Sequence, residues 1–507
     1  MLLLIFCGSN SLVVQSQDNG NNPSGNSKTR TIIVVFDGLR PDYITPDWMP
    51  NLYALAKKGA SGKDNHSVFP TVTRVNAASY ATGSYPAGHG LMGNSLYIPD
   101  VDSKKALNTG GAAELQRIMK ATSGKLLTAV SLGEVLASAG EKMIVYSSGT
   151  TGQAFLQNHT VNGAIINPEL ILPESFKAQL TAAIGPPPAD ATPNAARHQW
   201  ITDALCRYTL VDDGPLVSAI WFSDPDGTAH EHGIGVPITI AALRSVDEQL
   251  GRILDSIQAR GMENVFNIII TADHGFVSYA GNENLSQFLI EKGFKKGSAS
   301  DDVVIAGGAV YVQHHDPLLV QKMVEALQEQ EWVGAVFTRG KKPGSTEGVV
   351  QGTLSFESVH WNHPQRSADI LVTENWNDDK NNAGYEGTGF AKGVAGHGGS
   401  SPYEIHIPLI GYGPAFKRSF ENDFPTSNVD IVPTILYIHH IPIPGSMQGR
   451  VMHEMLLNDS FKQDKSKKET VVAEASYHWG KYKLMLERTR LGKYSYVNYT
   501  RVTRNIQ

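Results

Sequence analysis

The stretch "TIIVVFDG", residues 31–38, predicts how the chain folds. Its five consecutive apolar residues, mostly β-branched, are typical of a strand buried on both faces, which is the pattern of parallel sheets. Asp37 follows the run directly, and ligands bind at the carboxyl ends of the strands in open parallel sheets. The stretch therefore predicts an α/β fold with Asp37 at the ligand-binding edge of the sheet.

Similar apolar runs alternate with helical patterns up to about residue 280, so we expect a mostly parallel sheet flanked by helices. Further strands are predicted within 142–148, 214–224 and 264–273, and helices within 49–59, 126–140 and 237–261. The rhythm changes between about 284 and 390, where a strand–helix–strand pattern predicts a smaller inserted α+β subdomain. Residues 456–507 are expected to form a C-terminal extension with two short strand-like runs.

Composition excludes several classes of protein. The chain of 507 residues has a net charge of -6 and no long basic run, which argues against a nucleic-acid binder. Its two cysteines, Cys7 and Cys206, cannot build a disulfide framework or a cysteine zinc site. A metal would therefore have to be bound by His, Asp or Glu.

The N-terminus has the pattern of a targeting segment. Residues 1–17 are predicted to be an export signal and 18–29 a polar linker. We expect a secreted or periplasmic protein with no transmembrane helix in the mature chain, and membrane anchoring through Cys7 is the alternative. Asn-x-Ser/Thr sequons support export weakly and make glycosylation a hypothesis; they begin at Asn65, Asn158, Asn284, Asn458 and Asn498.

Acids and histidines follow the predicted strands: Asp37 after the first, Asp224, Asp226 and His230 after another, and Asp273 and His274 after a third. Carboxylates gathered at one sheet edge would repel and raise one another's pKa, and a cation relieves this. Imidazoles beside carboxylates favour zinc or another borderline transition metal. Each residue alone also fits a cap or turn, and a lone His397 in "AGHGG" also fits a structural role, but the constellation favours a metal site.

The stretch "FPTVTRVN", residues 69–76, offers a hydroxyl nucleophile. Thr71 and Thr73 lie where a turn feeds a predicted helix, and amides at a helix N-terminus attract anions. A hydroxyl beside two metals can lose its proton and become a nucleophile. These residues by themselves give metal-assisted phosphoryl transfer as a hypothesis, without choosing between the two threonines.

Six motifs carry a family resemblance: "FDGLRPDY", "FPTVTRVN", "ATGSYPAGHGLMGN", "DPDGTAHEHG", "TADHGF" and "GHGG". In this order they resemble the nucleotide pyrophosphatase/phosphodiesterase family of the alkaline phosphatase superfamily, over most of residues 31 to about 415. The resemblance implies an alkaline-phosphatase-like catalytic domain over 30–455. It also implies a small-molecule phosphate ester as substrate, of nucleotide type, whose phosphodiester or pyrophosphate bond is hydrolysed.

The resemblance implies two zinc ions and a role for each motif residue. One zinc would be bound by Asp226, His230 and His397, and the other by Asp37, Thr73, Asp273 and His274. Thr73 would also be the nucleophile, forming a phosphothreonine that water then hydrolyses. Asn94 would donate a hydrogen bond to a phosphate oxygen.

Two substrate-facing positions depart from the family pattern. Arg74 replaces the aromatic residue that usually follows the nucleophile, so it either binds a further anionic group of the substrate or is solvated. Trp221 stands where a tyrosine often faces the nucleobase, so it either stacks on a base or lies in the core. The departures affect substrate preference rather than the chemistry at phosphorus.

Other functions fit the sequence as well. Phosphomonoesterases and phosphonate hydrolases share the two-zinc core. The insertion near 100–125 offers lysines that either bind an anionic group or are solvated, namely Lys104, Lys105, Lys120 and Lys125. The non-enzyme alternative is a catalytically silent binding protein that kept the fold.

Overall fold

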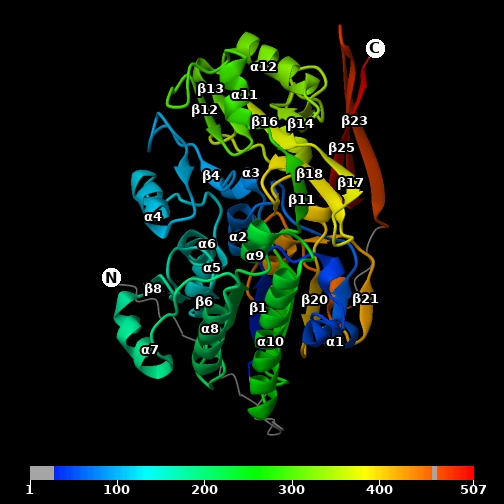
Figure 1. Cartoon of the computed structure of the whole chain (residues 1–507). Coiled ribbons are helices and arrows are strands. Elements are labelled where there is room, and N and C mark those ends of the chain that lie inside the picture. The colour runs from blue at the N-terminus through cyan, green and yellow to red at the C-terminus, as the bar shows by residue number, and fades with distance from the viewer. Residues whose placement is uncertain (1–27, 460–464, 507) are drawn as a thin grey trace, which may run out of the picture.

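The computed structural model describes residues 28–459 and 465–506 (Figure 1). The expected export signal and all but the last two residues of the expected linker therefore lie outside the described residues. In the part that is described, no helix is both long enough and apolar enough to cross a membrane.

A nine-stranded sheet, counted over the described residues, forms the centre of the molecule in the order β21-β2-β20-β10-β1-β9-β6-β7-β8. The middle strands, from β10 to β7, run parallel, and antiparallel pairing begins at β20 on one side and β8 on the other. The bounds are Phe420–Asn422 (β21), Ala60–Gly62 (β2), Leu409–Tyr412 (β20), Phe266–Ala272 (β10), Arg30–Phe36 (β1), Val217–Phe222 (β9), Met143–Ser147 (β6), Gly163–Asn167 (β7) and Leu170–Leu172 (β8). The predicted mostly parallel sheet is confirmed.

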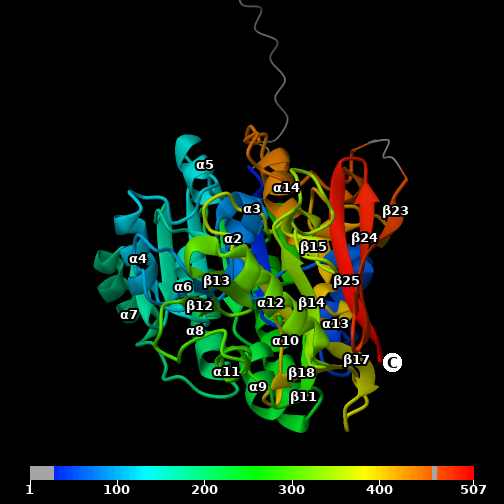
Figure 2. The same cartoon turned by 90° about the horizontal axis from the view of Figure 1, so that it is seen from above.

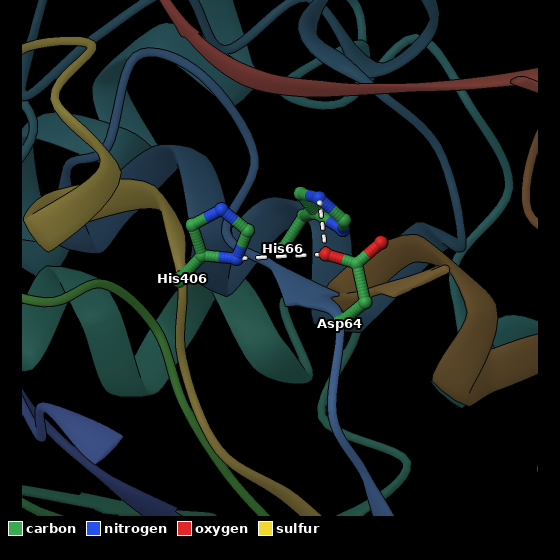
Figure 3. Close-up of side chains that lie close together, drawn as sticks. All are labelled: Asp64, His66 and His406. Carbon is green, nitrogen blue, oxygen red and sulfur yellow. Dashed lines mark ion pairs between the residues drawn. The ribbon is translucent and has the colours of Figure 1, made fainter. Parts of the chain in front are cut away.

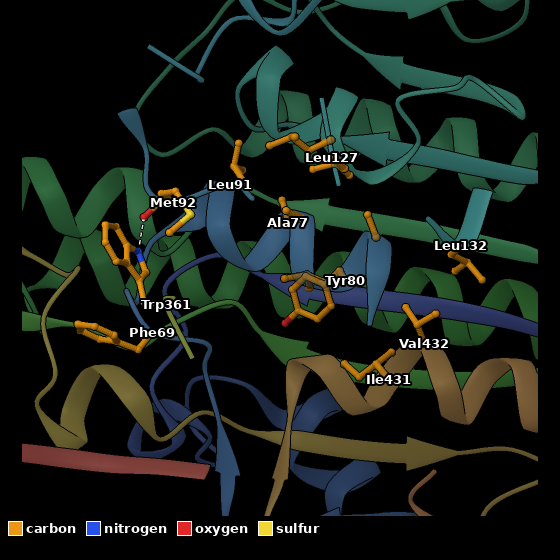
Figure 4. Close-up of a cluster of buried hydrophobic side chains, with 14 of the residues drawn as sticks. Phe69, Ala77, Tyr80, Leu91, Met92, Leu127, Leu132, Trp361, Ile431 and Val432 are labelled. Carbon is orange, nitrogen blue, oxygen red and sulfur yellow. Dashed lines mark hydrogen bonds between the residues drawn. The ribbon is translucent and has the colours of Figure 1, made fainter. Parts of the chain in front are cut away.

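Helices cover both faces of this sheet, as the apolar run of β1 requires. Ile32, Val34 and Phe36 pack in a core with α1 (Pro50–Lys58), α8 (Ala195–Tyr208) and α10 (Pro237–Ala259). Ile33 and Val35 point to the opposite core, with α2 (Thr73–Thr82), α5 (Leu132–Ser138), α6 (Thr151–Gln157) and α14 (Ile431–Ile438) (Figure 4). Successive side chains of a strand point to opposite faces, so β1 contributes to two cores at once.

A second sheet lies above the main one in Figure 1, in the order β12-β13-β16-β14-β15, with α11 and α12 packed on it. The bounds are Leu285–Glu291 (α11), Val303–Ala306 (β12), Ala309–Val312 (β13), Pro317–Glu329 (α12), Val333–Thr338 (β14), Leu354–Ser355 (β15) and Ile370–Glu374 (β16). A further sheet, β17-β18-β11-β19, consists of Val277–Gly281 (β11), Trp376–Lys380 (β17), Glu386–Lys392 (β18) and Ala395–Gly396 (β19). After β19 the chain passes through α13 (Pro402–Ile405) and returns to the main sheet at β20.

The C-terminal residues form an antiparallel sheet of long strands, β23 (Lys467–Tyr477), β24 (Gly480–Leu491) and β25 (Tyr494–Ile506) (Figure 2). The expectation of two short strands was wrong. Alternating side chains, among them Ala473, Ala475, Leu484 and Leu486, are buried against the rest of the molecule. This period of two supports long strands despite the many charged residues on the other face.

Shorter elements complete the fold: Asn65–His66 (β3), Pro86–His89 (α3), Ser95–Leu96 (β4), Leu107–Asn108 (β5), Ala112–Ala121 (α4), Lys177–Ile184 (α7), Asp226–His232 (α9), Pro402–Ile405 (α13) and Thr426–Ser427 (β22). Single 3₁₀ turns lie at Pro41–Tyr43, Glu174–Phe176, Gln313–His315, Phe356–Val359, Asn428–Asp430 and His453–Met455.

Candidate active site

Three neighbouring strands of the main sheet, β10, β1 and β9, deliver the acids of the site at their carboxyl ends. Asp37 directly follows β1, and Asp273 and His274 directly follow β10. Asp226 opens the short helix α9 after β9, which places His230 one turn later on the same helix face. His397 comes from a later part of the chain and directly follows β19.

These side chains form two adjoining groups. In the first, the Oδ1 atom of Asp226 lies 3.3 Å from Nε2 of His230 and 3.2 Å from Nε2 of His397. In the second, Nε2 of His274 lies 3.0 Å from Oδ2 of Asp273 and 3.5 Å from Oδ1 of Asp37. The imidazoles of His274 and His397 stack with their centroids 3.5 Å apart, so the groups touch.

The donor set fits two metal ions. Two of the three acids use one oxygen to bind the protein: Asp37 Oδ2 accepts from Nε1 of Trp221 at 2.9 Å, and Asp273 Oδ1 accepts from the amide of Gly38 at 3.0 Å. The oxygens that face the histidines, Asp37 Oδ1, Asp226 Oδ1 and Asp273 Oδ2, are buried and have no hydrogen-bond partner among the described residues. Unpaired buried acceptors are costly, and bound cations would satisfy them.

Backbone carbonyls fix the orientation of the histidines. The Nδ1 atoms lie 3.0 Å from the oxygen of Ala395 for His230, 3.0 Å from that of Gly275 for His274, and 2.7 Å from that of Thr71 for His397. A ring whose Nδ1–H donates to a carbonyl keeps the lone pair of Nε2 free, which is the usual arrangement of a metal-binding histidine.

Electrostatics within the site reflect crowded charge. Burial, reinforced by the charges of Asp273 and Asp226, raises the pKa of Asp37 well above its usual range. Burial lowers the pKa of His397 to about 4, helped by His274, so this ring is neutral near pH 7. Burial would also raise the pKa of Asp226, but His230 and His397 outweigh it and hold that pKa well below its usual range.

Thr73 begins helix α2 and points into the second group. Its hydroxyl is buried and lies 3.3 Å from Nε2 of His274. Thr71, the other candidate, donates its hydroxyl to the carbonyl of Gly399 at 2.8 Å. Thr73 is therefore the threonine positioned for chemistry, at the N-terminus of a helix that favours anions.

Asn94 is held near Thr73 by the first turn of α2. Its Oδ1 accepts a hydrogen bond from the backbone amide of Arg74 at 3.1 Å. This contact orients the side-chain amide and leaves its NH₂ group to donate elsewhere. The geometry is compatible with donation to a phosphate oxygen.

A cavity of about 340 Å³ opens from the site. Thr73, Arg74 and Asp226 line one end, and the far wall includes Ser148, Thr150 and Arg197, with Arg197 paired to Glu169 at 2.9 Å and Asp190 at 3.2 Å. Aromatic side chains are absent from the described residues that line it. The sequence reasoning missed this far wall, whose residues belong to no motif.

Arg74 reaches into this cavity rather than into bulk water. Burial lowers the pKa of its guanidinium, while the negative charges of Asp37, Asp226 and Asp273 oppose the shift. Its Nε is buried and makes no hydrogen bond with any residue the structure describes. Of the two interpretations drawn from the sequence, the geometry favours binding of an anionic group.

The predicted stacking of Trp221 on a nucleobase is wrong. The side chain is fully buried, packs edge-to-face on Tyr80 with centroids 5.6 Å apart, and donates to Asp37. It is a core tryptophan that holds a metal-facing carboxylate. Asp224, which the motif match left outside the metal groups, accepts from the backbone amides of Thr228 and Asn194.

Two further sets of residues were left open by the sequence. The lysines of the insertion, Lys104, Lys105, Lys120 and Lys125, are exposed and none lines the cavity. Among the sequons, the side chains of Asn65, Asn158 and Asn498 are buried, whereas those of Asn284 and Asn458 are exposed. Only the exposed pair is accessible to glycosylation.

The fold and the strand-end site define an alkaline-phosphatase-like α/β protein. The chain belongs to the type I phosphodiesterase / nucleotide pyrophosphatase family, whose model matches residues 31–379. The family is metal-dependent, and its named relatives are hydrolases, so the chain is a hydrolase and the relationship supports phosphodiester or pyrophosphate hydrolysis.

Individual relatives are distant. The chain is 24% identical over 428 residues to a bis(5'-adenosyl)-triphosphatase enpp4 of Xenopus laevis, covering 83% of this chain and 79% of that protein. It is 26% identical over 281 residues to a venom phosphodiesterase of Crotalus durissus collilineatus, covering 53% of this chain and only 30% of the venom protein. Murine ectonucleotide pyrophosphatase/phosphodiesterase 5 superposes with a TM-score of 0.59 at 16% identity, over 85% of this chain and 100% of that one. An inactive form of the murine protein has been solved in complex with AMP, with a TM-score of 0.60.

Proposed function

We propose that the protein is a zinc-dependent phosphodiesterase or nucleotide pyrophosphatase that works through a phosphothreonine on Thr73. The observation that carries the proposal is the convergence of three unpartnered buried carboxylate oxygens beside the Thr73 hydroxyl. Asp37, Asp273 and His274 would hold one zinc ion, and Asp226, His230 and His397 the other. His and carboxylate ligands suit zinc.

The residues divide the reaction into two displacements. Bound zinc would supply Lewis acidity, favouring ionised hydroxyls and offsetting charge on phosphorus oxygens. Thr73 gives its hydroxyl proton to solvent as Oγ1 attacks phosphorus, the bond to the leaving oxygen breaks, and that oxygen takes a proton from solvent. Water then attacks phosphorus, the bond to Oγ1 breaks, and Thr73 recovers a proton. Asn94 donates to a non-bridging oxygen as its charge grows.

The polar lining of the cavity indicates which class of substrate the site would bind. Because the residues lining it include no aromatic side chain, a base would be held by polar contacts rather than by stacking. We propose that Arg74 binds the phosphate next to the scissile bond, as in a pyrophosphate or dinucleoside polyphosphate. Export, as expected from the N-terminal sequence, belongs to the same proposal.

The test compares three nitrophenyl substrates on zinc-loaded protein: a nucleoside monophosphate ester, bis-nitrophenyl phosphate, and the phosphate monoester. We expect both diesters to react at least about 100-fold faster than the monoester, and a chelator to abolish all three rates until zinc is restored. A dominant monoester rate would reassign the site to phosphomonoester hydrolysis. Undiminished rates after metal removal would contradict the zinc proposal.

Replacement of Arg74 by methionine tests its proposed role. For a substrate with a second phosphate, kcat/KM should fall about 10- to 100-fold, since a hydrogen bond between charged groups contributes about 1.5–3 kcal/mol. For bis-nitrophenyl phosphate, which lacks that group, kcat/KM should change less than about threefold. Lys104→Met, at an exposed position, is the control. An equal fall in kcat/KM on both substrates would show that Arg74 does not bind a second anionic group of the substrate.

A further inference from the structure

We propose that Asp64, His66 and His406 form another metal site, outside both active-site groups, for a zinc-like transition-metal ion (Figure 3). Asp64 directly precedes β3, His66 is the second residue of β3, and His406 directly follows α13. The carboxylate of Asp64 points between the two imidazoles in Figure 3. Its Oδ1 lies 3.4 Å from Nε2 of His66 and 3.7 Å from Nδ1 of His406.

The spacing of these atoms suits direct coordination. Bonds of about 2.0–2.1 Å in a tetrahedral zinc site place neighbouring ligand atoms roughly 3.3 Å apart. Besides the two distances from Asp64, the Oδ1 atom of Asn498 lies 3.0 Å from Nε2 of His66. Two imidazole nitrogens and a carboxylate oxygen therefore lie within 4.8 Å of one another, and the amide oxygen of Asn498 lies beside one of them, His66 Nε2.

Three atoms with lone pairs lie close together here: Nε2 of His66, Oδ1 of Asn498 and Oδ1 of Asp64. Nδ1 of His66 lies 2.8 Å from the carbonyl of Thr426, so Nδ1–H donates there and Nε2 of the neutral ring carries a lone pair. The amide of Asn498 is oriented by its Nδ2, which donates to Glu487 at 3.0 Å, so Oδ1 faces His66. The oxygens of Asn498 and Asp64 both lie near this Nε2, and a cation between them would bind all three atoms.

The orientation of His66 matches that of the active-site histidines. His230, His274 and His397 also direct Nδ1 to a backbone carbonyl and Nε2 to a carboxylate. His66 is only 1% exposed, so its ring is held in this orientation. The arrangement is the usual one for a metal-binding histidine.

Charge and access also suit a cation. Lys468 interacts with Asp64 but is paired with Glu487 at 3.1 Å, so two carboxylates share one lysine. The side chain of His406 is 34% exposed and that of Asp64 is 28% exposed, so an ion and a water ligand can enter from solvent. Asn498 belongs to β25, so a bound ion would link the C-terminal sheet to the core.

The decisive measurement is the metal content of the full-length enzyme, read as a difference between variants. After equilibration with zinc and removal of free metal, His406→Ala should hold one ion fewer per chain than the wild type. Its hydrolysis rate should stay within about twofold, because His406 is not part of the catalytic groups. Thr73→Ala and the exposed-site control His478→Ala should keep the wild-type content. This comparison does not depend on how many ions the active site holds.

A second variant distinguishes loss of the metal site from misfolding of the protein. Asp64→Asn keeps the shape of the side chain and should also lose one ion, with unchanged circular dichroism. Titration of zinc-depleted wild-type protein should show one binding event more than titration of zinc-depleted Asp64→Asn. Equal metal content in the wild type and both variants would overturn the proposal.

Discussion

Turnover by Thr73→Ala is expected to fall about 10,000-fold or more, while the zinc content of the active site stays unchanged. Oγ1 of Thr73 is the buried hydroxyl beside His274, whereas the hydroxyl of Thr71 is engaged by Gly399. Losing a catalytic nucleophile removes the covalent route and leaves only binding and electrostatic stabilisation. Single-turnover rates on a nitrophenyl diester, together with elemental analysis, measure both quantities.

Two companion experiments sharpen this result. Thr73→Ser keeps a hydroxyl at the same place and should retain measurable turnover. Denaturation of the wild type during turnover should trap on Thr73 the phosphoryl group with the substrate's remaining ester group. Loss of activity accompanied by loss of zinc would instead assign Thr73 mainly to metal binding. Near-normal rates in Thr73→Ala would refute the nucleophile.

Arg450→Met is expected to lower the free energy of unfolding by about 3–5 kcal/mol. The guanidinium is 5% exposed and donates to both carboxylate oxygens of Glu454, at 2.6 and 2.9 Å. It also donates to the carbonyl of Pro425 at 2.7 Å and to the hydroxyl of Tyr496 in β25 at 2.9 Å. Without Arg450, the buried carboxylate of Glu454 loses both of these charge-assisted hydrogen bonds. Denaturant unfolding monitored by fluorescence measures the loss.

A double substitution separates the ion pair from simple packing. Arg450→Met with Glu454→Leu removes both charges and should recover most of the lost stability, since buried pairs are often replaceable by apolar residues. The surface pair of Arg117 and Glu114, 2.9 Å apart, is the matched control, and Arg117→Met should cost less than about 1 kcal/mol. No recovery in the double variant would mean that packing or the bonds to Pro425 and Tyr496 dominate.

The strand-end part of the site could be predicted from the sequence. An apolar run followed by an acid specifies both a buried parallel strand and the edge where its acid lies, as for Asp37 and Asp273. His230 follows Asp226 by four residues, and a single helical turn brings the two together. Local periodicity therefore carries enough information to place these groups.

Other features depend on contacts between distant segments. His397 and Asn94 could be assigned only through the family resemblance, because no local pattern links them to the strand ends. His66 and His406 are brought together by an isolated β-bridge between segments far apart in the chain. The burial of Trp221 follows from packing of α2 over β9, which a sequence pattern does not specify.

Successive side chains of β1 pack in two different cores, and this limits where the chain can change in length during evolution. Inserting or deleting one residue between Ile32 and Phe36 would exchange the side chains destined for each face and shift Asp37 out of line with its neighbours. Lengthening the loops around Gly110 and Asp190, which border the cavity, disturbs neither core. We therefore expect that natural or directed evolution of substrate preference can change the length of these loops but not the length of the strand.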